Sequence, residues 1–214
     1  MADKINCLLC NSRAEFLSLF RGKQYYRCSH CLSVMMDPQQ FLGPAEEKSR
    51  YDQHNNDVND PGYRNFVRPL VDKIEERHGA IETGLDFGAG SGPVAAVMLR
   101  ERGYKEIELY DPYYHSDRSV FNRHYHFIIC SEVIEHFHRP AESFELLSSL
   151  LRPGGSLFCL TALYDQDIDF EKWYYKNDPT HVFFYHCRAL HWIKQEYNFT
   201  DLEMEDRIIR FKKA

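Results

Sequence analysis

Two pairs of cysteines are the first residues in the chain whose types and spacing could do chemistry. Cys7 and Cys10 form one C-x2-C pair, and Cys28 and Cys31 form another after seventeen intervening residues. This spacing is typical of a site in which four thiolates surround one Zn²⁺ tetrahedrally. Because four thiolates leave no coordination position open, the spacing predicts a structural zinc ion. Iron held by the same four ligands is the alternative that the residues leave open.

A glycine-rich stretch, "LDFGAGSGP", could hold a nucleotide-like ligand. Gly88, Gly90 and Gly92 follow a short apolar run that contains Asp86. The order is typical of a strand that breaks into a loop before a helix. The dinucleotide fingerprint G-x-G-x-x-G is not met, because Pro93 stands where its third glycine belongs, and no Lys-Ser/Thr follows as in a P-loop. The stretch therefore predicts a loop whose backbone approaches a ligand without a pyrophosphate at the helix terminus.

Two carboxylates belong to the same predicted site. Asp86 stands just before the loop, where it could reach an ammonium group of a ligand directly or through water. Asp111 follows the next apolar run, "EIELY", where a carboxylate can accept both hydroxyls of a ribose. Ligands of open α/β sheets bind outside the carboxyl ends of the strands. We therefore expect both carboxylates and the glycines to meet in one crevice.

Strands and helices that would position these residues alternate along the chain. The patterns predict an amphipathic helix over 62–79 and a short helix over 46–51, then strands and helices in βαβ order, which indicates a mainly parallel sheet with covered faces. The predicted strands are 83–87, 106–110, 127–130 and 156–161, and the helices are 93–102, 140–151 and 187–196. A further short strand is expected in "SVFNRH", and a strand pair in the C-terminal "DLEMEDRIIRFKKA".

Composition limits the classes of protein that remain. The chain has 214 residues, 43% of them hydrophobic, which is enough for one well-cored domain and a small appendage. No apolar run approaches a membrane span and the start has no signal-peptide core, so we expect a cytoplasmic protein without a membrane segment. The net charge of −6 gives no overall basic field for nucleic acid, although a local basic patch stays open.

Four motifs in order carry a resemblance to a known family. "LDFGAGSGP", "ELYDP", "FIICSEVIEHF" and "LLRPGG" resemble the successive motifs of class I S-adenosylmethionine-dependent methyltransferases, across roughly residues 62–214. The resemblance implies a Rossmann-like, doubly wound α/β fold with a mainly parallel, seven-stranded sheet and an antiparallel last strand. It also implies that S-adenosylmethionine is the cofactor.

The resemblance assigns roles to residues of this chain. Gly88, Gly90 and Gly92 would line the methionine portion of the cofactor, and Asp111 would take its ribose. Cofactor contacts are also implied at four further positions, Asp86, Tyr63, Ser131 and Glu132. Of these, Tyr63 lies in the region that commonly covers the cofactor, and the two residues after the fourth strand would flank the amino acid or the sulfonium.

Three histidines are candidates for a general base, since imidazole titrates near neutral pH. His54 lies in the polar connector before the first long helix, His136 in "SEVIEHF", and His181 in "NDPTHVFFY". By the resemblance, these segments cover the cofactor, stand beside the sulfonium and line the acceptor pocket, respectively. Purely structural roles are the alternatives: His136 would form hydrogen bonds only with the backbone or with Glu132, and His181 would be an ordinary loop residue.

The chain is predicted to have three parts. Residues 1–38 form the zinc ribbon, 39–61 a connector or lid, and 62–214 the methyltransferase domain. A cysteine ribbon ahead of such a domain resembles some sugar C-methyltransferases and many bacterial methyltransferases. The expected function is methyl transfer to a small molecule or biosynthetic intermediate. An RNA or protein methyltransferase, or a non-catalytic binding module with a retained fold, is the alternative, and the sequence does not define an oligomeric state.

Overall fold

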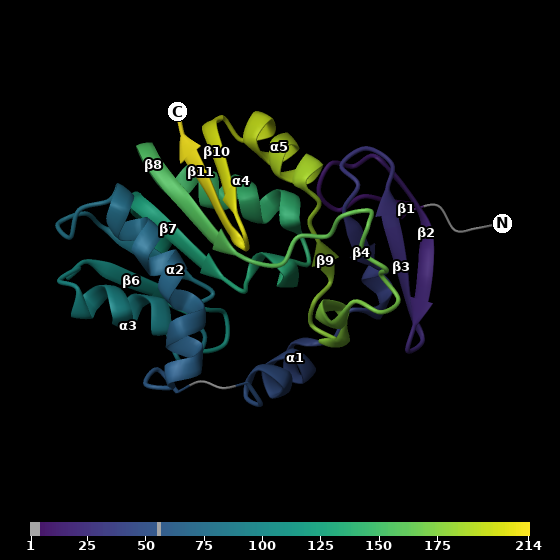
Figure 1. Ribbon diagram of the computed structural model, residues 1–214, viewed down its shortest axis with the longest axis horizontal. Coiled ribbons are helices and arrows are strands. Elements are labelled where there is room, and N and C mark those ends of the chain that lie inside the picture. Colours follow the sequence, from purple (N-terminus) through teal and green to yellow (C-terminus); the bar gives the residue numbers. More distant parts are fainter. Residues whose placement is uncertain (1–4, 55–56) are drawn as a thin grey trace.

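The computed structural model describes residues 5–54 and 57–214. Its larger sheet has six strands in the order β10-β11-β8-β7-β5-β6 (Figure 1). β5 (Gly84–Phe87), β6 (Ile107–Tyr110), β7 (Tyr125–Ser131) and β8 (Leu151–Leu160) pair in parallel, and β11 (Ile208–Lys213) is antiparallel to both β8 and β10 (Phe199–Glu205). The sheet is therefore mainly parallel with an antiparallel last strand, as the motifs implied.

Helices cover both faces of this sheet because the strands are apolar on both sides. α2 (Pro61–Arg77) and α3 (Val94–Glu101) pack on one face, against alternate strand residues such as Phe127 and Ile129. α4 (Pro140–Leu150) and α5 (Cys187–Glu196) pack on the other face, against Ile128 and Cys130. The alternation along "FIIC" follows from the two-residue period of a strand.

Three expectations about this sheet were wrong. "SVFNRH" lies in a 3₁₀ helix, η2 (Arg118–Asn122), which is capped by the carboxylate of Asp117 rather than paired with a strand. Within the described residues the main sheet has six strands and not seven. "RPGG" does not separate α4 from its strand, because β8 begins at Leu151, opposite Tyr125, and the register then shifts before pairing resumes at Ser156.

The N-terminal residues form a second, antiparallel sheet. β1 (Ile5–Asn6), β2 (Arg13–Phe20), β3 (Lys23–Cys28) and β4 (Val34–Met36) pair in sequence, and β9 (Phe183–Phe184) adds a fifth strand from the far end of the chain. Figure 1 shows this purple sheet beside β9, near α5. Cysteine spacing did not predict β4 or β9, because β9 has only two residues and its pairing with β4 is long-range.

The remaining elements are short and lie near the open end of the main sheet. They are α1 (Pro44–Tyr51), which begins at a Gly43–Pro44 step, and the 3₁₀ helices η1 (Pro38–Gln40), η3 (Ile134–His136) and η4 (Tyr174–Asn177). In Figure 1, α1 lies between the N-terminal end of α2 and the second sheet. Among the residues described, no helix is both long enough and apolar enough to cross a membrane.

Candidate active site

A cavity of about 1100 Å³ opens where β5, β6 and β7 end. α1 and the segment 174–181 form its other walls. This is the place where open α/β sheets bind ligands. Ten of the eleven predicted cofactor and histidine positions line it, namely His54, Tyr63, Gly88, Gly90, Gly92, Asp111, Ser131, Glu132, His136 and His181.

The glycine loop needs its glycines for backbone geometry and for space. Gly88 and Gly90 have φ angles of +78° and +60°, a region that side chains with a Cβ rarely occupy. A Cβ on Gly88 would stand 2.5 Å from Cγ2 of Val133. The amide of Gly88 donates to the carbonyl of Tyr110 at 2.8 Å, which ties the loop to the end of β6. The loop therefore presents bare backbone to the cavity.

Asp86 is the predicted cofactor residue that does not line the cavity. It is buried beneath the loop, and its Oδ2 accepts the amide of Ala96 at 3.3 Å, within α3. Burial raises the pKa of this carboxyl to about 7, and the Ala96 amide opposes that rise. The structure thus places Asp86 as a support between β5 and α3, and a direct contact with a ligand ammonium stays a prediction.

Asp111 lines the cavity and also organises its rim. Its Oδ2 accepts the amide of Gly90 at 3.1 Å, and its Oδ1 accepts the amides of Tyr113 and Tyr114 at 2.8 and 3.1 Å. A carboxylate offers about four acceptor positions, so one remains on Oδ2 for a ligand hydroxyl. The side chain therefore couples the glycine loop to the turn after β6.

Two polar residues at the end of β7 face the same cavity. The Oγ of Ser131 is buried without a hydrogen-bond partner among the described residues. Glu132 has a φ of +53°, an uncommon and strained backbone for a residue with a side chain. Its Oε1 accepts from Nη2 of Arg207 at 2.7 Å. An orphaned hydroxyl beside a strained carboxylate residue is typical of a ligand-binding position.

The histidine end of the cavity consists of His54, His136 and His181. The rings of His136 and His181 lie 4.7 Å apart between centroids. Burial lowers the pKa of His136 to about 3, with the neighbouring His181 adding to the effect, and burial lowers the pKa of His181 to about 4. Both rings are therefore neutral at physiological pH, and a neutral imidazole can accept a hydrogen bond or bind a cation.

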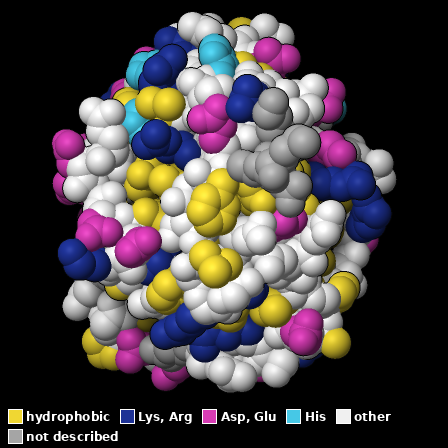
Figure 2. Space-filling model, turned by 90° about the vertical axis from the view of Figure 1, so that its right-hand side faces the viewer, with side chains coloured by type: hydrophobic (Ala, Val, Ile, Leu, Met, Phe, Trp, Pro, Cys, Tyr) yellow, Lys and Arg dark blue, Asp and Glu magenta, His cyan; other side chains and the backbone are white. Residues whose placement is uncertain are grey.

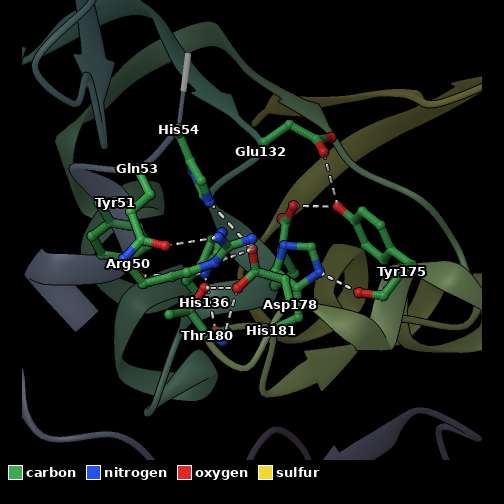
Figure 3. A network of polar contacts seen from close by, with 11 residues as sticks. Arg50, Tyr51, Gln53, His54, Glu132, His136, Tyr175, Asp178, Thr180 and His181 are labelled. Atoms are coloured by element: carbon green, nitrogen blue, oxygen red, sulfur yellow. Dashed lines mark hydrogen bonds and ion pairs between the residues drawn. The ribbon is translucent and has the colours of Figure 1, made fainter. Parts of the chain in front are cut away.

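A buried carboxyl lies behind these rings. Glu135 is 1% exposed, and its Oε1 and Oε2 accept the hydroxyls of Tyr175 and Thr161, the second at 3.0 Å. Burial raises the pKa of Glu135 to about 8, and the nearby charge of Glu132 raises it further. The Tyr175 hydroxyl contacts both carboxyl groups, because it also lies 3.3 Å from Oε2 of Glu132, as drawn in Figure 3.

Asp178 connects α1 to this end of the cavity. Its Oδ2 accepts from Nη2 of Arg50 at 2.8 Å and contacts Nε2 of His54 at 3.2 Å, while its Oδ1 accepts the hydroxyl of Thr180 at 2.6 Å (Figure 3). Burial would raise the pKa of Asp178, but these hydrogen bonds outweigh it and hold the pKa well below its usual range. The predicted connector therefore contacts the site through charged side chains.

The four predicted metal-ligating cysteines come together. The sulfur atoms of Cys7, Cys10, Cys28 and Cys31 all lie within 4.8 Å of one another, and three of the four residues are buried. The amides of His30 and Cys31 point to the sulfur of Cys28 at 3.3 and 3.4 Å. Four converging thiols fit a tetrahedral ion in donor type and number. The His30 ring is not part of the cluster.

Several site residues had no signal of their own in the sequence. Tyr175, Thr161 and Arg207 contact Glu132 or Glu135, but they lie in three separate segments and match no motif. Arg207 follows a tight turn between β10 and β11, and only strand pairing brings it to Glu132. The aromatic run "FEKWYYKNDPTHVFFYH" was the one available hint, because it combines polar and aromatic residues as pocket walls do.

Comparison with known proteins agrees with this geometry. A family model described as a methyltransferase domain matches residues 60–204. The chain therefore belongs to this methyltransferase domain family. It is also 33% identical over 85 residues to the ubiquinone biosynthesis O-methyltransferase of Yersinia pestis (strain Pestoides F). That match covers 40% of this chain and 35% of the length of the relative.

Two solved structures share the fold. One is a Burkholderia thailandensis 1,6-didemethyltoxoflavin-N1-methyltransferase with bound 1,6-didemethyltoxoflavin and S-adenosylhomocysteine, with a TM-score of 0.57 and 14% identity over 94% of this chain and 100% of that one. The other is an O-methyltransferase family protein from the same organism, with a TM-score of 0.55 and 12% identity over 78% of this chain and 63% of that one. At these identities the likeness concerns the fold alone.

Proposed function

We propose that the protein transfers the methyl group of S-adenosylmethionine to a small-molecule acceptor. The observation that carries the proposal is the cavity at the glycine loop, where backbone at positive φ and the orphaned Ser131 hydroxyl face the space at the strand ends. Membership of the methyltransferase domain family supports it. When bound, S-adenosylmethionine supplies an electrophilic methyl group on a sulfonium and leaves as S-adenosylhomocysteine.

The chain's own residues would hold this cofactor along the strand ends. Gly88, Gly90 and Gly92 let the backbone approach the methionine portion, and the remaining acceptor position of Asp111 takes a ribose hydroxyl. Ser131 and Glu132 flank the amino acid, and Tyr63 covers it from the first turn of α2. The donor set fits, because Ser131 gains the partner that it lacks among the described residues and the carboxylates of Asp111 and Glu132 line the same cavity.

The acceptor would bind at the histidine end. Small-molecule pockets commonly measure about 300–1,000 Å³, so a cavity of about 1100 Å³ has room for a cofactor and a small acceptor together. A hydroxyl acceptor suits the neutral imidazoles of His136 and His181, which can accept its hydrogen bond, although their lowered pKa values make them weak general bases. An oxygen acceptor also agrees with the name of the Yersinia relative, an O-methyltransferase.

Surface charge supports a small molecule over RNA. The net charge is −6, and the face shown in Figure 2 mixes Lys and Arg with Asp, Glu and hydrophobic side chains. An RNA-binding face usually carries a continuous basic stripe. A scaffold without catalysis would not need the positive-φ glycines or the cavity carboxylate at Asp111, which disfavours the binding-module alternative.

A structural Zn²⁺ belongs to the same proposal. Cys7, Cys10, Cys28 and Cys31 would bind it with Zn–S distances of about 2.3 Å and no open position. All seven cysteines of the chain are free thiols. Free thiols are typical of proteins in the reducing cytoplasm, where we propose that this protein acts.

Cofactor binding is tested by titrating the protein with S-adenosylhomocysteine in a calorimeter. We expect one site per chain, and an affinity about 10- to 100-fold lower for Asp111→Asn, because a charge-assisted hydrogen bond is lost. Asp117→Asn is the matched control, since Asp117 also accepts a backbone amide two residues on but lies outside the cavity. Absence of binding to the zinc-loaded wild type would refute the proposed function.

A further inference from the structure

A second group of metal-ligating side chains lies at the histidine end of the cavity. One ligand atom each from Glu135, His136 and His181 lies within 4.8 Å of the other two. Two of these residues belong to η3, and the third precedes β9, so the fold joins them over more than forty positions of sequence. None of them is needed to hold the cofactor described above.

Both histidine rings are oriented as metal ligands usually are. Nδ1 of His181 lies 2.7 Å from the carbonyl oxygen of Tyr175, and Nδ1 of His136 lies 2.9 Å from that of Thr180. A carbonyl oxygen only accepts, so each Nδ1 carries the proton and each Nε2 keeps its lone pair. In a metal-bound imidazole, the ring nitrogen that does not bind the metal commonly donates a hydrogen bond to a backbone carbonyl.

The carboxyl of Glu135 is held in place by hydrogen bonds and forms no ion pair with the described residues. Its two oxygens accept hydroxyls from Tyr175 and Thr161, which are neutral donors. The guanidinium of this network, Arg207, pairs with Glu132 at 2.7 Å. A carboxyl buried to 1% exposure favours its uncharged form, and a bound cation would stabilise the carboxylate, whose oxygens each have a lone pair to offer.

We propose that Glu135, His136 and His181 bind a divalent transition-metal ion, such as Mn²⁺, Fe²⁺, Co²⁺ or Zn²⁺. Two neutral imidazoles and one carboxylate are the mixed nitrogen and oxygen donors that these ions accept, whereas Mg²⁺ and Ca²⁺ favour oxygen alone. Three protein ligands leave further coordination positions open. His136 and His181 line the cavity, so those positions face its interior.

The ion would bind the oxygen of the methyl acceptor. This role rests on the proposed function, since it needs an acceptor in the cavity. A hydroxyl bound to a divalent ion loses its proton to water more readily, and the resulting oxygen anion attacks the methyl carbon. The bond from carbon to oxygen forms as the bond from carbon to sulfur breaks, and its electron pair stays on sulfur. The two histidines then act as ligands, and the ion replaces them as the activating group.

The binding of Mn²⁺ by the full chain, with its cysteine site loaded with zinc, tests this site. Electron paramagnetic resonance reports free Mn²⁺ directly, and Mn²⁺ has little affinity for thiolates. We expect one Mn²⁺ per chain in wild type. His181→Asn keeps an amide donor for the Tyr175 carbonyl but lacks Nε2. It should weaken Mn²⁺ binding by about 100-fold or more. Loss of a contact that only supports a ligand costs about 10- to 100-fold, so a larger loss indicates a direct ligand.

The control is His78→Asn, a histidine buried to the same 8% exposure that also contacts a carboxylate, Glu82, but lies outside the cavity. We expect His78→Asn to bind Mn²⁺ as tightly as wild type does. That result shows that the loss of a buried imidazole ring does not by itself remove the ion. Absence of Mn²⁺ binding to wild type, or equal binding by His181→Asn, overturns the proposal.

Calorimetry with S-adenosylhomocysteine separates this test from that of the proposed function. If wild type binds S-adenosylhomocysteine but no Mn²⁺, the metal site is wrong and the cofactor site stands. If it binds Mn²⁺ but no S-adenosylhomocysteine, the cation site stands as a binding site, and its role toward a methyl acceptor is wrong.

Discussion

At the scale of single residues, the site depends on backbone conformations that most side chains do not adopt. Gly88 and Gly90 have positive φ, and so does Glu132, whose side chain makes that conformation costly. All three lie at the ends of neighbouring strands, facing one cavity. These three positive φ angles therefore shape the backbone that faces the cavity.

Gly88→Ala tests the steric part of this argument. Left-handed backbone costs about 1–2 kcal/mol for an alanine, and contact of its Cβ with Val133 adds to that. We expect a lower free energy of unfolding in urea and at least about 10-fold weaker binding of S-adenosylhomocysteine by calorimetry.

Gly22→Ala is the matched control for this prediction. Gly22 has a φ of +79°, but a Cβ there meets nothing within 4 Å. The Gly22→Ala variant should lose stability only through the cost of left-handed backbone. It should keep its affinity for S-adenosylhomocysteine. Equal effects of the two substitutions would show that the close approach at Val133 is unimportant.

At the scale of elements, α1 acts as a bridge across the cavity. Glu47 of this helix accepts the hydroxyl of Tyr113 at 2.7 Å and contacts Nε2 of His138 at 2.9 Å. At its other end Arg50 pairs with Asp178. The helix is thus fixed to the turn after β6, to the segment after β7 and to the segment before β9. Its position depends on polar contacts, which ligands and pH can alter.

Asp178→Asn should loosen α1. Hydrogen bonds to a charged group contribute about 1.5–3 kcal/mol, so we expect a loss of that size in the free energy of unfolding near neutral pH, and faster proteolysis at α1. The folded-state pKa of Asp178 is depressed, so its contribution is present above the ordinary value of 3.8 and is lost as pH falls below it. Urea titrations should therefore show the difference from wild type shrinking below about pH 4.

Asp169→Asn serves as its control, because Asp169 pairs with Lys172 on the surface of the same segment. Exposed pairs contribute about 0–1 kcal/mol. If Asp169→Asn lowers the free energy of unfolding as much as Asp178→Asn does, the contacts of Asp178 with Arg50 and His54 do not stabilise the protein more than an exposed ion pair does.

At the scale of the whole molecule, the N-terminal sheet and the methyltransferase domain share one hydrophobic core. Cys28, Tyr25 and Met35 pack in the same cluster as Phe144 and Leu190 of α4 and α5. β4 pairs with β9, and the amide of Met36 donates to the carbonyl of Val182 at 2.8 Å, directly after His181. The N-terminal sheet therefore supports the histidine end of the cavity rather than forming a detached appendage.

Cys28→Ser should remove the zinc and destabilise the whole chain. Elemental analysis of wild type, purified without added metal ions, is expected to give at least one equivalent of zinc per chain, and the variant should lack the equivalent bound by the cysteines. Structural zinc contributes much of the folding energy of small ribbons. A loss of about 3 kcal/mol or more would lower Tm by about 6–12 °C for a chain of this size.

Cys187→Ser provides the comparison, since Cys187 is exposed at the start of α5 and belongs to no cluster of ligands. It should keep both zinc and Tm. Wild-type protein that folds without zinc would remove the claim of a structural ion.

Local sequence patterns were sufficient for the elements and motifs that depend on near neighbours. The glycine loop, the cysteine pairs and the strand–helix alternation all follow from backbone preferences and periodicity within a few residues. They located the fold and ten of the cavity-lining positions. "SVFNRH" was misjudged because a capping aspartate at Asp117, which favours a 3₁₀ turn, outweighed its weak strand pattern.

Tertiary structure alone decided how distant residues combine. Three contacts join segments far apart in the chain: the pairing of β9 with β4, the approach of Arg207 to Glu132, and the approach of His181 to Glu135 and His136. Such contacts form because burial and strand pairing are satisfied by the whole fold, and no local pattern encodes them. The sequence by itself determined a methyltransferase fold with a glycine loop, and the packed structure decided which side chains meet at the histidine end of the cavity.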